Sequence, residues 1–154
     1  MTYWKIPPII KVYEALGAVA DSRVHLAGDS AKVYSSSGNK FYEVNYDASE
    51  NAIMTNDNGS YWKGYLGYPA IAYLLATDVL EYKQELGDLL KNIAWKDLNT
   101  KFKNDFSKTL EHILFPLPDD RKLELEEYTD KLLADVAKLK LKHLGKKVPP
   151  PAGY

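Results

Sequence analysis

A short run of aromatic and basic residues carries the clearest binding chemistry in this sequence. The run Tyr61-Trp62-Lys63-Gly64-Tyr65 combines flat rings with a cation. Rings stack on unpaired bases and lysines attract phosphates, so this composition is typical of surfaces that bind single-stranded nucleic acid. Packing of the same rings in the core is the alternative, and the sequence alone favours it because large rings bury much apolar area.

A second basic feature lies near the C-terminus, where residues 138–147 contain five lysines and no acid. Lysines at such a position could contact phosphates. They also suit the negative end of a helix dipole, and the sequence favours this solvated helix end. The candidate binding residues are therefore these: Tyr61, Trp62, Lys63, Tyr65, Lys138, Lys142 and Lys146.

No arrangement of residues indicates catalysis or a cofactor. Nucleophilic catalysis needs a base beside its nucleophile, and the histidines are scattered over a predicted strand and two predicted helices: His25, His112 and His143. The segment 56–59 (NDNG) could suggest calcium, but it lacks the later glutamate of an EF-hand loop and is predicted to be a turn. We predict no catalytic residue, no metal and no cofactor. A small enzyme that uses Glu43 or Asp57 is the third-ranked function.

Composition is that of an ordinary globular domain. The chain has 154 residues, 45% of them hydrophobic and 27% charged, which fits one domain with a real core. A net charge of −1 gives no overall attraction to nucleic acid or acidic membranes, and the absence of cysteine fits an intracellular protein. The longest apolar run, residues 69–76, is far shorter than the roughly 20 residues that span a bilayer. We expect a soluble, cytoplasmic protein without a signal peptide.

Hydrophobic periodicity predicts an α+β domain. It indicates an N-terminal helix over residues 8–21 and a small antiparallel β-meander, with strands at 23–27, 33–38, 41–46 and 52–55. About three helices follow, at 69–93 with a break near 77–78 or 87, at 95–113, and at 119–145. Residues 1–145 form one domain in this prediction, and residues 146–154 form a flexible, proline-rich tail.

The stretch 33–75 resembles the SWIM zinc-binding module. The residues Val33-Tyr34-Ser35-Ser36-Ser37-Gly38, followed by Tyr42-Glu43-Val44, match its hairpin, and residues 64–75 match its following helix. The positions of the four zinc ligands hold residues that cannot bind zinc through thiolate or imidazole: Ile53, Thr55, Gly67 and Pro69. The resemblance therefore implies the framework of the module without its metal. We expect packed rings to join hairpin and helix instead: Tyr61, Trp62, Tyr65 and Tyr68.

The resemblance also implies a function, because SWIM-type proteins are associated with DNA transactions and with protein contacts in chromatin remodelling, transposition and recombination. The leading hypothesis is a non-enzymatic interaction module, an accessory of DNA metabolism that acts through protein–protein contacts. Its partner is an unidentified protein or a second copy bound through the C-terminal helices. Direct binding of single-stranded nucleic acid through the aromatic and basic residues is the alternative.

Overall fold

Four short segments form an antiparallel meander. The structure is a computed structural model and describes residues 2–152. The strands are β1 (Val24–Ala27), β2 (Ser30–Tyr34), β3 (Phe41–Asp47) and β4 (Ala52–Thr55). A fifth strand, β5 (Lys142–His143), pairs in parallel with β4, so the sheet order is β1-β2-β3-β4-β5. The predicted turn between β2 and β3 is confirmed, with Gly38 at a φ of 78° that its missing side chain permits.

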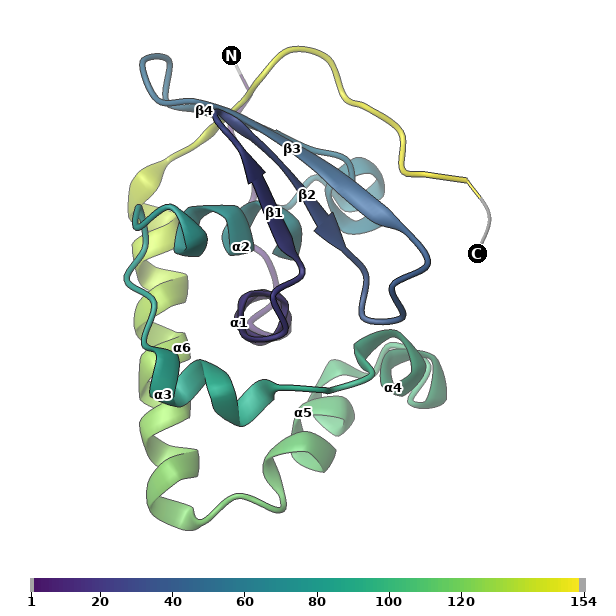
Figure 1. The fold of residues 1–154 in the computed structure, drawn as a ribbon, viewed down its shortest axis with the longest axis vertical. Helices are drawn as coiled ribbons and strands as arrows, with labels where there is room; N and C mark the ends of the chain where they lie inside the picture. The colour runs from purple at the N-terminus through teal and green to yellow at the C-terminus, as the bar shows by residue number, and fades with distance from the viewer. Residues whose placement is uncertain (1, 153–154) are drawn as a thin grey trace.

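The helical segments surround one central helix. They are α1 (Ile10–Ala20), η1 (Gly59–Lys63), α2 (Tyr68–Ala76), α3 (Gln84–Gly87), η2 (Asp88–Leu90), α4 (Trp95–Lys101), α5 (Phe106–Leu114) and α6 (Asp119–Leu139). Figure 1 shows α1 end-on between the sheet and the C-terminal helices, with the long α6 along one side. The predicted α+β class is confirmed.

The core lies where α1 and α2 pack beneath the sheet. Strand alternation places Val33, Val44 and Ile53 on the inner face, and each is fully buried. Leu16 of α1 and Ile71 of α2 are also fully buried. Each large side chain of this kind contributes about 1.5–3 kcal/mol by leaving water. The sheet and the two helices therefore form the rigid base on which the surface segments are held.

Two predicted helices have different boundaries in the structure. The predicted helix at 95–113 is divided into α4 and α5, because Lys103 and Asn104 both adopt positive φ and Asp105 starts a new helix by accepting from the Lys108 amide at 3.3 Å. The predicted helix at 119–145 ends at Leu139 rather than near Gly145. Lys140 adopts the left-handed conformation with φ 48°.

A long-range contact stabilises the C-terminus of α6, which comes earlier in the chain than predicted. Nδ2 of Asn51 donates to the carbonyl oxygens of Leu139 and Lys140 at 2.8 and 3.2 Å. The side chain thus satisfies carbonyls that a helix end leaves without intrahelical partners. The chain then turns into β5 instead of continuing as a helix, which explains why no strand was predicted there.

The last described residues return over the sheet (Figure 1). Asn56 Nδ2 donates to the Pro149 carbonyl oxygen at 3.5 Å. The predicted flexible tail spans residues 146–154, of which 153–154 lie outside the described residues, and its flexibility stays a prediction. Within residues 2–152, none of the helices combines the length and apolar character needed to cross a bilayer.

Candidate nucleic-acid interface

A buried carboxylate joins the sheet to the start of α2. Asp57 is 6% exposed, and its oxygens accept from Thr55 Oγ1 and Ser60 Oγ, both at 2.7 Å, and from the Ser60 amide at 3.2 Å. Ser60 Oγ accepts in turn from the Gly67 amide at 3.0 Å. A Cβ at Gly67 would overlap the Asp57 carboxylate, so glycine is required there. These hydrogen bonds connect β4 to the N-terminus of α2.

The prediction that packed rings make this connection is wrong for Trp62. Its indole is 71% exposed, and Tyr61 is half-buried with its ring edge-on to Trp62 at 4.7 Å between centroids. Tyr65 is half-buried beside Gly59, and burial raises the pKa of its hydroxyl. Tyr68 does contact the hairpin, edge-on to Tyr42 at 6.1 Å. The Asp57 hydrogen bonds hold β4 and α2 together, so this connection does not require burial of every ring.

The turn η1 presents Trp62 and Lys63 to the solvent. It is a π-helical turn, a rare and wide conformation that is frequent at functional sites. Gly64 ends it with φ 77°, a conformation that favours glycine. Lys63 is exposed beside Trp62. The Asp57 hydrogen bonds to Ser60 therefore fix the turn from inside while its outer residues remain available.

The N-terminal segment, residues 2–6, lies next to this turn. Lys5 pairs with Gly64 and Leu66 through backbone hydrogen bonds of 3.0 Å, and Tyr3 forms a bridge with Lys142. The extended backbone alternates its side chains. Trp4 therefore faces inward, where it stacks on His143 at 3.7 Å and donates from Nε1 to the Ile53 carbonyl at 2.9 Å. Tyr3 (57% exposed) and Lys5 remain at the surface.

A groove of about 450 Å³ runs between η1, the N-terminal segment and the chain after β5. We call it the Trp62 groove. It is lined mainly by two rings, three lysines and a histidine: Tyr3, Lys5, Trp62, Lys63, His143 and Lys147. No aspartate or glutamate is found among the described residues that line it. Lys147 Nζ donates to the Tyr61 carbonyl at 3.3 Å, which ties the C-terminal lysines to the aromatic turn.

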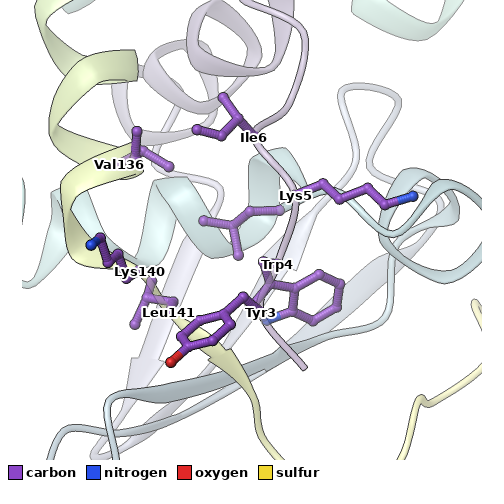
Figure 2. Close-up of a pocket in the computed structure, with 9 residues that line it drawn as sticks. Tyr3, Trp4, Lys5, Ile6, Val136, Lys140 and Leu141 are labelled. Atoms are coloured by element: carbon purple, nitrogen blue, oxygen red, sulfur yellow. The ribbon is translucent and has the colours of Figure 1, made fainter. Parts of the chain in front are cut away.

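A second hollow lies on the other side of the N-terminal segment. Figure 2 shows it, with Ile6 beside Val136 and with Tyr3 near Lys140 and Leu141, while the side chain of Lys5 extends away from α6. Its volume is about 320 Å³. Tyr3 and Lys5 line both hollows, so the segment separates the Trp62 groove from the hollow beside Lys140.

The structure brings only part of the predicted binding set together. Trp62 and Lys63 line the groove, and Lys146 is exposed one residue before Lys147. Tyr61 lies directly behind Trp62, and half-buried Lys142 lies in β5 opposite Tyr3. Two predicted residues lie elsewhere: Lys138 lines a hollow beside Asp78 and Asp135, and Tyr65 lies on the inner side of η1.

Four of the six main groove residues are absent from the predicted binding set: Tyr3, Lys5, His143 and Lys147. The alternation of Tyr3, Trp4 and Lys5 is typical of a strand. No strand was predicted there, because the two prolines that follow were interpreted only as the start of a helix. Of the two carboxylates of the enzyme hypothesis, Glu43 is exposed on β3, and the Asp57 oxygens accept three hydrogen bonds.

His143 gives the groove a neutral base at its floor. Burial lowers the pKa of its imidazole, and the charge of Lys147 lowers it further. The ring is therefore uncharged near neutral pH and stacks on Trp4. Positive charge in the groove comes from the lysines, whose ammonium groups are the natural partners of phosphate oxygens.

The described residues contain no group of three histidine, aspartate or glutamate side chains placed to hold a metal ion. Comparison with known proteins adds one relationship, a family model that matches residues 4–142. The chain belongs to the family of uncharacterised conserved protein UCP014422. No curated protein and no solved structure matches this UCP014422 chain significantly. The matched region contains η1 and residues 4–6, so Lys5, Trp62 and Lys63 of the groove lie within it, and the other three main groove residues lie outside it: Tyr3, His143 and Lys147.

Proposed function

We propose that this chain binds single-stranded nucleic acid in the Trp62 groove. One observation carries the proposal: an indole that is 71% exposed lies beside a cationic groove whose described lining has no carboxylate. An exposed aromatic side chain at a hollow is a recurrent feature of binding sites, because its apolar area is removed from water only when a ligand covers it.

The chemistry of the groove matches a nucleic acid strand. Trp62 and Tyr3 offer exposed ring faces, and stacking of a base on such a ring is worth about 1–3 kcal/mol. Lys5, Lys63 and Lys147 offer charges for the phosphates that join successive bases. Since the bases of a duplex already stack on each other, this combination favours unpaired strands over duplexes.

Local charge explains how a nearly neutral protein can attract a polyanion. The formal net charge of the whole chain is −1. Many of its acids lie in α6, whose first turn contains Asp119 and Asp120, whereas the groove lysines lie at the opposite end of that helix and beyond. Field strength near a surface depends on such local separation of charge. The groove is therefore a local cationic surface on a nearly neutral molecule.

The SWIM resemblance is compatible with this proposal. Modules of that class are associated with DNA transactions, so we place the chain among the accessory proteins of DNA metabolism. The Asp57 hydrogen bonds support the resemblance, because they connect Thr55 with Gly67, two positions where that module has zinc ligands. Contact with a protein partner, or with a second copy through the C-terminal helices, stays a prediction.

The test is a fluorescence-anisotropy titration of labelled oligonucleotides with the full chain at low salt. We expect saturable binding to single-stranded oligothymidylate or oligouridylate, and weaker binding to a duplex of equal length. Trp62→Ala removes the stacking face and should weaken binding by roughly 5- to 150-fold, which corresponds to about 1–3 kcal/mol. Phe115→Ala is the matched control, because Phe115 is 84% exposed outside the groove.

Three results would contradict the proposal. The first is the absence of saturable binding to either single strand. The second is equal affinity for duplex and single strands, and the third is an equal effect of Trp62→Ala and Phe115→Ala. Comparison of oligodeoxyuridylate with oligouridylate shows whether the groove prefers deoxyribose or ribose, since only the 2′-hydroxyl separates these two strands.

A further inference from the structure

The hollow of Figure 2 has an apolar end and a cationic end. Its volume is about 320 Å³, and we call it the Lys140 hollow. At the apolar end, Ile6 of the N-terminal segment lies beside Val136 of α6. The lining continues with Leu66 and Leu141, whose side chains are nearly fully buried. Pockets of this volume that combine apolar walls with a few polar groups are typical sites for small molecules.

Two of the large apolar side chains that remain exposed in the described chain line this one hollow. Tyr3 is 57% exposed and Ile6 is 53% exposed. The backbone holds both in place, because the Trp4 amide donates to the Leu141 carbonyl and the Lys5 amide donates to the Gly64 carbonyl, each at 3.0 Å. Exposed apolar side chains that gather at a hollow indicate a ligand that covers them.

Lys140 supplies the charge at the cationic end. Its side chain is exposed and forms no salt bridge with any residue that the structure describes. Figure 2 shows it near Tyr3, whose hydroxyl is a second possible donor. No aspartate or glutamate is found in the described lining of the hollow. An accessible ammonium without a competing carboxylate favours an anionic group on the ligand.

The backbone at the end of α6 fixes the position of this cation. Lys140 adopts the left-handed conformation, where glycine is the usual residue at a helix end. Asn51 Nδ2 donates to the carbonyls of Leu139 and Lys140. These hydrogen bonds occupy two of the carbonyls whose partial negative charge would repel an anion at a helix C-terminus. The bend therefore presents an ammonium where the helix end alone would disfavour an anion.

We propose that the Lys140 hollow binds a small amphiphilic anion, of the class of the medium-chain fatty acids. The carboxylate accepts from the Lys140 ammonium and the Tyr3 hydroxyl, and the apolar tail lies against Ile6 and Val136. Three of these four residues are absent from the described lining of the Trp62 groove: Ile6, Val136 and Lys140. The proposal therefore does not depend on the proposed nucleic-acid binding.

The experiment is isothermal titration calorimetry of the full chain with three probes: octanoate, octylamine and acetate. At about pH 7 octanoate carries a negative charge and octylamine a positive charge on the same tail, whereas acetate has the carboxylate without the tail. We expect saturable binding of octanoate, at least about tenfold tighter than that of either other probe, because only octanoate uses both ends of the hollow.

Lys140→Gly removes the ammonium and suits the observed φ of 48°, so the variant should remain folded. It should weaken octanoate binding by about tenfold or more. The matched control is Lys103→Gly, which replaces another exposed lysine with a positive φ, 53°, outside the hollow. This control should bind octanoate like the unaltered chain. Ile6→Ser shortens the apolar end and should weaken octanoate binding by about fivefold.

Circular dichroism verifies that each variant is folded before its affinity is compared. The proposal is overturned if octanoate shows no saturable binding at up to about 10 mM, a very weak affinity. It is also overturned if octylamine or acetate binds as tightly as octanoate. Equal octanoate affinities of Lys140→Gly and Lys103→Gly would place the anion elsewhere on the protein and overturn it as well.

Discussion

Replacement of Asp57 by alanine tests the hydrogen bonds that join the sheet to α2. The carboxylate accepts three hydrogen bonds, from Thr55 Oγ1, Ser60 Oγ and the Ser60 amide, at distances between 2.7 and 3.2 Å. Hydrogen bonds to a charged acceptor contribute about 1.5–3 kcal/mol each. Their sum is an upper bound, since Asp57 is 6% exposed and burial of its charge costs several kcal/mol.

We expect Asp57→Ala to lower the free energy of unfolding by about 3 kcal/mol, because it leaves two hydroxyls and one amide buried without an acceptor. A domain of this size loses about 2–4 °C of melting temperature per kcal/mol, so the midpoint should fall by about 6–12 °C. Urea unfolding followed by circular dichroism measures the change, with the slope m unchanged if only stability is affected.

Two further variants make the measurement specific. Thr55→Val removes one of the three hydrogen bonds and should cost about 1 kcal/mol. Asn58→Ala changes an exposed neighbour and should leave stability within about 0.5 kcal/mol. The reasoning is refuted if Asp57→Ala is as stable as Asn58→Ala, because the sheet and α2 would then be joined by other contacts.

Two more predictions concern buried positions. Gly17→Ala should destabilise the fold by about 1–2 kcal/mol in urea unfolding although alanine is the better helix former, because its Cβ would lie 2.7 Å from Trp95 Nε1; a gain in stability would contradict this packing. Burial lowers the pKa of His143 in the folded chain, so its stability contribution is present above pH ~6.5, the unfolded value, and is lost as the pH falls through the folded pKa. His143→Phe should remove this part of the pH dependence of unfolding, and an unchanged pH profile would count against it.

Strands and core helices were predictable because burial imposes a period on the sequence. The strand at 52–55 was predicted with the observed boundaries, and β3 differs by one residue at its end. The strand predicted at 33–38 is displaced, since β2 is Ser30–Tyr34. The end of α6 was not predictable in the same way. It depends on Asn51, whose side chain reaches a carbonyl 88 residues later in the chain, and no local pattern contains that contact.

The positions of the aromatic rings also could not be predicted from the sequence. Trp62 and Tyr68 are six residues apart in one aromatic stretch, yet one is 71% exposed and the other contacts Tyr42 in the core of the hairpin. Composition gives both the same tendency for burial. The difference arises from the π-helical turn and from Asp57, which holds that turn by hydrogen bonds that a local pattern does not reveal.

The salt dependence of oligonucleotide binding tests the central claim most directly. Three lysines line the Trp62 groove, and each phosphate contact on a single strand contributes about −0.7 to the slope of log K against log salt, so a slope near −2 is expected. Lys63→Gln should make the slope less negative by about 0.7. Lys138 lies in a different hollow, so Lys138→Gln should leave the slope unchanged. Binding that is insensitive to salt, or equal slopes for the unaltered chain and Lys63→Gln, would contradict the account.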